Sequence, residues 1–102
     1  MSQASISERA AGQLQLSGVL DYRTGPQLRE QGARLIAASS AAQLSLDCSA
    51  VEKSSSVGLA LLLAFVRDAR KAGRELSISA LPDDMREIAQ VSGLLELLPL
   101  QP

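Results

Sequence analysis

Residues 47–59 read DCSAVEKSSSVGL, and this segment says more about the fold than any other part of the chain. It overlaps an alternating stretch, residues 44–48, that is typical of a half-buried strand. After it, apolar side chains recur at the helical spacing i, i+3, i+4 and i+7, namely Leu59, Leu62, Leu63 and Val66. We therefore expect a polar loop between the carboxyl end of a strand and the N-terminus of a helix. In open α/β folds, partners and ligands usually bind at such carboxyl ends.

Two further segments, residues 13–17 and 76–79, alternate in the same way, and residues 5–10 form a weaker strand candidate. In the three clear strands one set of positions is mostly Leu or Ile, and the other is Gln, Ser or Asp. A parallel sheet covered on both faces would be apolar at nearly every position. The pattern instead predicts helices on one face of the sheet and a polar, mostly uncovered opposite face.

A first helix is expected to begin at Thr24, which has the side chain of an N-cap residue. Pro26 then lies in the first turn, and Gln27 completes a capping box with Thr24. The helix should end within the small and polar residues 37–42.

The second helix should end at Gly73, and a third should run from Pro82 to Gly93. Residues 94–98 form a short apolar segment after it. The resulting order is strand, strand, helix, strand, helix, strand, helix, short helix. This order predicts one α/β domain over residues 1–102, with a mixed four-stranded sheet whose later strands are parallel.

The composition of the 102 residues excludes several classes of function. The chain has no His and one Cys, Cys48, which removes His-based metal sites, Ser-His and Cys-His nucleophile pairs, and disulfides within the chain. Tyr22 and Phe65 are the only aromatic side chains and the formal charge is −1, so no nucleic acid partner is expected. We therefore expect that the chain is not an enzyme and that it binds no metal, cofactor or small-molecule substrate.

The first ten residues lack the basic start and the long apolar core of a secretory signal. The longest apolar run, residues 57–66, is far shorter than the roughly 20 residues of a membrane-spanning helix. We therefore expect a cytoplasmic protein without direct membrane insertion, whose connection to a membrane would depend on a partner.

Three consecutive serines, Ser54, Ser55 and Ser56, stand where the second helix should begin. Ser is a common capping residue. For Ser54 and Ser55, a capping role alone is therefore about as good an explanation as a contact with a partner. One cap is enough for a helix, and we expect Ser56, at or beside the N-cap, to contact a partner. Tyr22 either covers the core or lies at the rim of this interface. The residues expected to bind the partner are Lys53, Ser54, Ser55, Ser56, Val57 and Gly58.

The segment resembles the loop and second helix of STAS domains, the sulfate-transporter and anti-sigma-factor-antagonist family. The pattern of that family is D-x-S-x-V-x-x-hydrophobic-D-S-S/T-G-L-G. Its matching positions here are Asp47, Ser49, Val51, Ser56, Gly58 and Leu59. Residues 16–21 and 92–94 resemble a strand with its following turn and a late S-G-L turn of the family, so that the similarity extends over nearly the whole chain.

Within the family, the run at residues 58–63 is most similar to the small STAS subunits of Mla-type phospholipid-transport ABC complexes. This resemblance implies an accessory protein that binds the ATPase subunit of the complex, supports its assembly and activity, and lies peripheral to the inner membrane. The alternative is an anti-sigma factor antagonist, in which phosphorylation of Ser56 controls partner switching. Ser55 replaces the acidic residue of the family pattern, Ser54 its hydrophobic residue, and Val57 a second Ser, Thr or Gly. The missing acidic residue at Ser55 favours the first interpretation.

Overall fold

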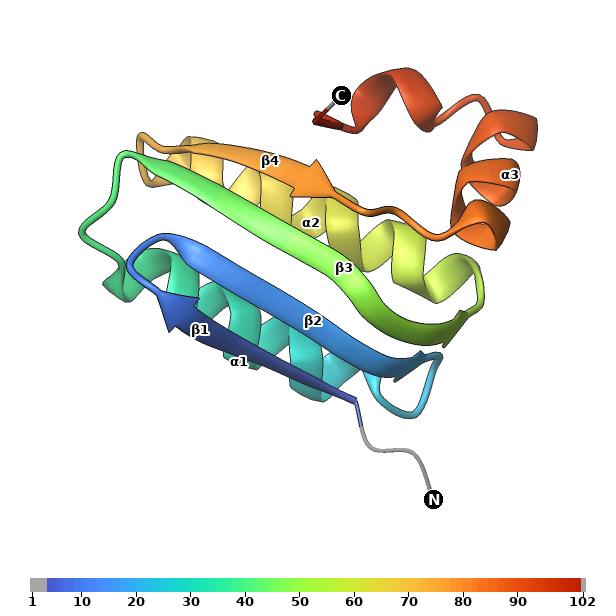
Figure 1. Cartoon of the computed structure of the whole chain (residues 1–102), viewed down its shortest axis with the longest axis horizontal. Helices are drawn as coiled ribbons and strands as arrows, with labels where there is room; N and C mark the ends of the chain where they lie inside the picture. The colour runs from blue at the N-terminus through green and yellow to red at the C-terminus, as the bar shows by residue number, and fades with distance from the viewer. Residues whose placement is uncertain (1–3, 102) are drawn as a thin grey trace.

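The computed structural model describes residues 4–101 as a sheet with helices packed on one side (Figure 1). The elements are β1 (Ser5–Ala10), β2 (Gln13–Leu20), α1 (Gly25–Ala38), β3 (Gln43–Ser54), α2 (Ser56–Lys71), β4 (Glu75–Ser79), α3 (Asp83–Val91) and the short 3-10 helix η1 (Leu95–Leu97). The strand order is β1-β2-β3-β4, with β1 antiparallel to β2 and the other two pairs parallel. The expected mixed α/β architecture and the expected element order are confirmed.

The alternating strands place their apolar side chains toward α1 and α2, which lie side by side on one face of the sheet in Figure 1. Leu16, Leu46 and Ile78 from three neighbouring strands are fully buried there. The other positions of these strands, such as Gln15 and Ser45, are partly exposed on the opposite face. The prediction of one covered and one polar face is therefore confirmed.

The two long helices approach closely because α1 carries a glycine at their crossing. A Cβ atom on Gly32 would lie only 2.2 Å from Cε1 of Phe65, which is 1% exposed. Leu62 is fully buried as expected, whereas Leu63 is only partly buried, which corrects the expected apolar stripe. Because α2 also packs against β4 and α3, its buried side includes Leu61, whereas Leu63 lines an open groove beside η1.

The expected capping box of α1 is wrong. Thr24 occupies the N-cap position, but its hydroxyl donates to the Val19 carbonyl at 2.8 Å and accepts from the Asp21 amide at 3.1 Å. The side chain therefore closes the turn between β2 and α1 instead of capping the helix. Gln27 is exposed, and Pro26 lies in the first turn as expected.

The far edge of β4 is partly covered by the segment after η1. The amide of Ile78 donates a hydrogen bond to the Pro99 carbonyl, and the carbonyl of Ile78 accepts one from the Gln101 amide, both at 2.8 Å. Among residues 4–101, no helix combines the length and the apolar character needed to cross a membrane.

Candidate functional site

The segment expected to be a loop is mostly strand. β3 continues through Ser54, which pairs with Leu20 at the end of β2, and Ser55 alone separates β3 from α2. The register of β3 on β2 shifts between Gln15 and Ser17 and again between Gly18 and Val19. At each shift β3 has one residue more than β2, which is the definition of a β-bulge. These bulges interrupt the alternation, and this is why the periodicity predicts a strand that ends at Cys48.

The first bulge is held by Asp47, whose Oδ1 accepts a hydrogen bond from the Ser49 amide at 2.8 Å. This bond, followed by one from the Ser49 hydroxyl, holds the pKa of the Asp47 carboxyl below its usual value. The neighbouring Cys48 side chain points into the core and is fully buried. Burial raises the pKa of its thiol to about 12, so Cys48 stays protonated and packs as a small apolar residue.

The three serines at the end of β3 have different surroundings. The Ser54 hydroxyl donates to the Ser55 carbonyl at 2.8 Å. Ser55 is the N-cap of α2, because its Oγ accepts from the Val57 amide at 3.2 Å while its own amide donates to the Leu20 carbonyl at 2.9 Å. Ser56 is exposed in the first turn, and within residues 4–101 its hydroxyl has no hydrogen-bond partner. Of these three serines, Ser56 is therefore the one whose hydroxyl forms no hydrogen bond within residues 4–101.

Gly58, in the first turn of α2, packs against the ends of β2 and β3. It is buried, and a Cβ atom there would lie 2.0 Å from Oγ of Ser54 and 3.2 Å from Cδ1 of Leu20. The absence of a side chain lets the first turn of α2 approach the ends of β2 and β3. Val57 is half-buried against the first turn of α1, where a Cβ on Gly25 would lie 3.0 Å from its Cγ1.

The turn between β2 and α1 lies at the same edge of the sheet. Asp21 Oδ1 accepts from the amides of Arg23 and Thr24 at 2.9 and 3.2 Å, which fixes the turn. Tyr22 is 71% exposed, so it does not cover the core. The Arg23 guanidinium lies 5.5 Å from the centre of the Tyr22 ring.

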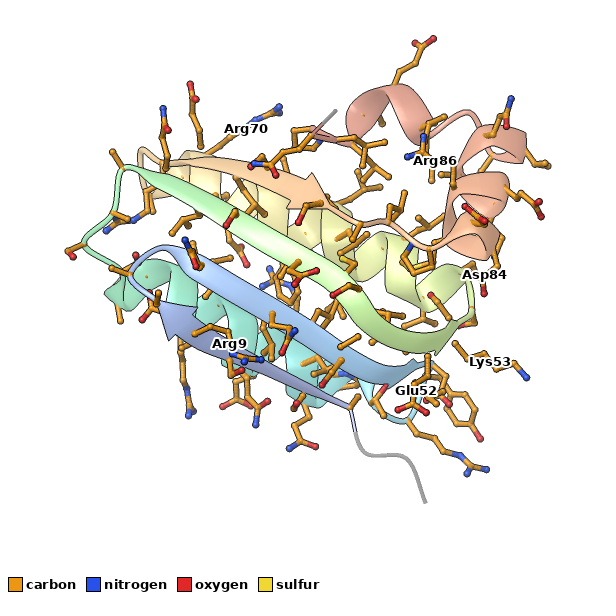
Figure 2. All side chains as sticks on the ribbon, in the orientation of Figure 1. Arg9, Glu52, Lys53, Arg70, Asp84 and Arg86 are labelled. Atoms are coloured by element: carbon orange, nitrogen blue, oxygen red, sulfur yellow. The ribbon has the colours of Figure 1, made fainter. Side chains whose placement is uncertain are left out.

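Arg23 is absent from the residues that the sequence singled out. The signal that could have found it is topological, because the carboxyl ends of two adjacent parallel strands meet at one edge of a sheet. Figure 2 shows Glu52 and Lys53 at this edge, next to the turn after β2. We call five residues at this edge the Ser56 surface: Tyr22, Arg23, Lys53, Ser56 and Val57. The exposed Glu52 lies beside them.

The Ser56 surface combines a free hydroxyl, an exposed aromatic ring and two cations. These groups are typical of protein contacts, in which a small hydroxyl can donate or accept without occupying much space. Among the described residues, no three His, Cys, Asp or Glu side chains gather as a metal site.

Comparison with solved structures gives neighbours of the same fold. A chain of the Acinetobacter MlaFEDB complex in an ATP-bound conformation matches with a TM-score of 0.82 at 24% identity, over 95% of this chain and 99% of that one. An anti-sigma factor antagonist from Mycobacterium paratuberculosis matches with a TM-score of 0.77 at 27% identity, over 100% and 86%. The anti-sigma factor antagonist SpoIIAA in its unphosphorylated form matches with a TM-score of 0.73 at 16% identity, over 98% and 89%.

No curated protein sequence matches the chain. A family model, described as "Mlab, STAS domain", matches residues 5–99. Its match covers nearly all described residues and agrees with the fold of the structural neighbours. The chain belongs to the STAS domain family.

Proposed function

We propose that this chain is a non-catalytic accessory subunit that binds the ATPase of an Mla-type phospholipid-transport ABC complex and supports its assembly and activity. It would lie on the cytoplasmic side of the inner membrane, held there by the complex. The proposal is supported by the similarity to nearly the full length of a chain in the MlaFEDB complex. It is also supported by the family model described as "Mlab, STAS domain".

The observation that carries the proposal is the free, exposed hydroxyl of Ser56 on the Ser56 surface. The hydroxyls of Ser54 and Ser55 are already hydrogen-bonded where β3 meets α2. Gly58 lets the two elements approach each other closely there. The first turn of α2 is therefore fixed in position before a partner arrives. A fixed surface loses little conformational freedom on binding, which favours a stable subunit contact.

The test is to replace Ser56 with Arg and to measure co-purification with the ATPase. Ser56→Arg should leave the fold intact, because Ser56 is exposed and Ser55 provides the cap. A long cation at the centre of a packed interface leaves its desolvation uncompensated, so the variant should no longer bind. Ser56→Ala should bind nearly normally. Ser40→Arg, in the exposed turn before β3 at the opposite end of the sheet, is the matched control and should also bind.

The result that would overturn the proposal is a folded Ser56→Arg variant with wild-type affinity for the ATPase. Such a result would place the docking surface elsewhere on the molecule. Thermal unfolding of each variant shows whether a loss of binding is separate from a loss of fold.

A second candidate function is that of an anti-sigma factor antagonist controlled by phosphorylation of Ser56. The exposed, unpartnered Ser56 hydroxyl and the 27% identity to the mycobacterial antagonist favour it. A phosphate would add nearly two negative charges at the middle of the surface and release a close-packed partner. Mass spectrometry of the protein purified from its own cells separates the two functions. Stoichiometric phosphate on Ser56 supports the second, and unmodified Ser56 supports the first.

A further inference from the structure

A groove of about 470 Å³ lies between α2 and η1, away from the strand ends. Its apolar floor is formed by Leu63 and Val66 of α2, together with Leu97 of η1. Leu97 is 57% exposed and Leu63 is only partly buried, so two large apolar side chains are open to solvent here. An exposed apolar groove on a small domain indicates a binding surface when its rim is polar.

The rim of the groove carries two cations. Arg67 and Arg70 line it, and Glu96 lies on the η1 side. The ion pairs among residues 4–101 are Arg29 with Asp68 and Arg34 with Glu30, so neither rim arginine has a carboxylate partner. Figure 2 shows Arg70 pointing away from the body of the protein beyond the edge of β4.

The groove continues the Ser56 surface along α2. Ser56, Ala60, Leu63 and Arg67 are spaced i, i+4, i+7 and i+11, which places them on one side of a helix. At a rise of 1.5 Å per residue, this stripe is about 16 Å long. A partner that contacts Ser56 can therefore reach the groove without leaving α2.

We propose that the groove between α2 and η1 receives an amphipathic helix of the same ATPase partner, with apolar residues at i, i+3 and i+4 and carboxylates beside them. The apolar side of such a helix fills the floor at Leu63 and Leu97, and its carboxylates meet Arg67 and Arg70. This inference rests on the proposed function, because it assigns a second contact to the same partner. It explains both the open apolar floor and the two unpaired cations.

The test compares affinities of the purified chain for the purified ATPase by isothermal titration calorimetry. Leu97→Asp and the double variant Arg67→Glu with Arg70→Glu should each weaken binding by about tenfold or more. Lys71→Glu is the matched control for charge, because Lys71 is exposed on the other side of α2, near α1. Val91→Asp is the matched control for an exposed apolar residue, since Val91 is 89% exposed and does not line the groove. Both controls should bind as the wild type does.

The outcomes distinguish the inference from the proposed function. If Ser56→Arg loses binding while folded groove variants keep wild-type affinity, the groove inference is wrong and the proposed function stands. If the wild-type chain does not bind the ATPase, both are wrong. Light scattering of the same samples identifies another occupant, because a dimer of the chain that Leu97→Asp converts to a monomer would assign the groove to a second copy and overturn the inference.

Discussion

Replacing Gly58 with Ala tests whether the tight join between β3 and α2 positions the Ser56 surface. The added Cβ would lie 2.0 Å from Oγ of Ser54, so the Ser54 side chain must rotate and give up its hydrogen bond to the Ser55 carbonyl. A lost hydrogen bond of this kind costs about 1 kcal/mol. The 3.2 Å contacts with Cβ of Ser54 and Cδ1 of Leu20 add an overpacking cost of about 1–2 kcal/mol.

The helical propensity of Ala over Gly offsets about 0.5–1 kcal/mol of this cost. Gly58→Ala should therefore lower the free energy of unfolding by about 1–2.5 kcal/mol, measured by urea denaturation. The informative measurement is a double-mutant cycle with Ser54→Ala. Removal of the Ser54 hydroxyl eliminates the closest contact, so Gly58→Ala in that background should cost at most about 1 kcal/mol.

A coupling energy near zero between the two substitutions would refute the reasoning, because it would mean that the first turn of α2 does not approach Ser54 as described. The same variants also connect stability to binding. Gly58→Ala should weaken binding of the ATPase although Gly58 is buried, because it displaces the first turn that carries Ser56. Ser54→Ala alone should bind as the wild type does, since Ser55 still caps the helix.

Two further predictions concern the core and the bulge. Leu62→Ala should lower the free energy of unfolding by about 2–5 kcal/mol because Leu62 is fully buried, whereas Leu63→Ala, at a partly buried position, should cost about 1 kcal/mol. Equal costs in urea melts would contradict the orientation of α2. Asp47→Asn tests the lowered pKa of Asp47. The charged carboxylate stabilises the fold at pH values above the pKa of Asp47 in the unfolded chain, and this stabilisation is lost as the pH falls through the pKa in the folded chain. The variant should be less stable by at most about 1 kcal/mol at pH 6 and should equal the wild type at the lowest pH; a difference that does not change with pH would contradict this.

Local patterns were sufficient for most of the fold. The alternation at residues 13–17 predicts a strand that the structure extends to Leu20, and the end of α2 near Gly73 is confirmed by its φ of +73°. Both signals depend on residues that are close in sequence. The polar face of the sheet is predicted for the same reason, since every second position of a strand points the same way.

Features that depend on contacts outside the local periodic pattern were predicted less well. The hydroxyl of Thr24 bonds to the Val19 carbonyl, so the helix start is right and the capping box is wrong. Leu63 has the spacing of a core residue, but its burial depends on how η1 is placed beside α2. The second half of β3 is missing from the sequence prediction because two bulges break its alternation, and a bulge is visible only when the partner strand is known.

The contact of Ser55 with β2 also bears on the replacement of the family's acidic residue by Ser55. Where the family pattern has an acidic residue, this chain has the residue that caps α2 and whose amide bonds to the Leu20 carbonyl at the end of β2. Asp and Ser cap helices about equally well, so the exchange preserves the capping role at this position. It removes a negative charge directly beside Ser56. The chain thus keeps the helix cap but lacks the acidic neighbour that belongs to the phosphorylation pattern, and for this reason we propose contact with the ATPase over a kinase-operated switch.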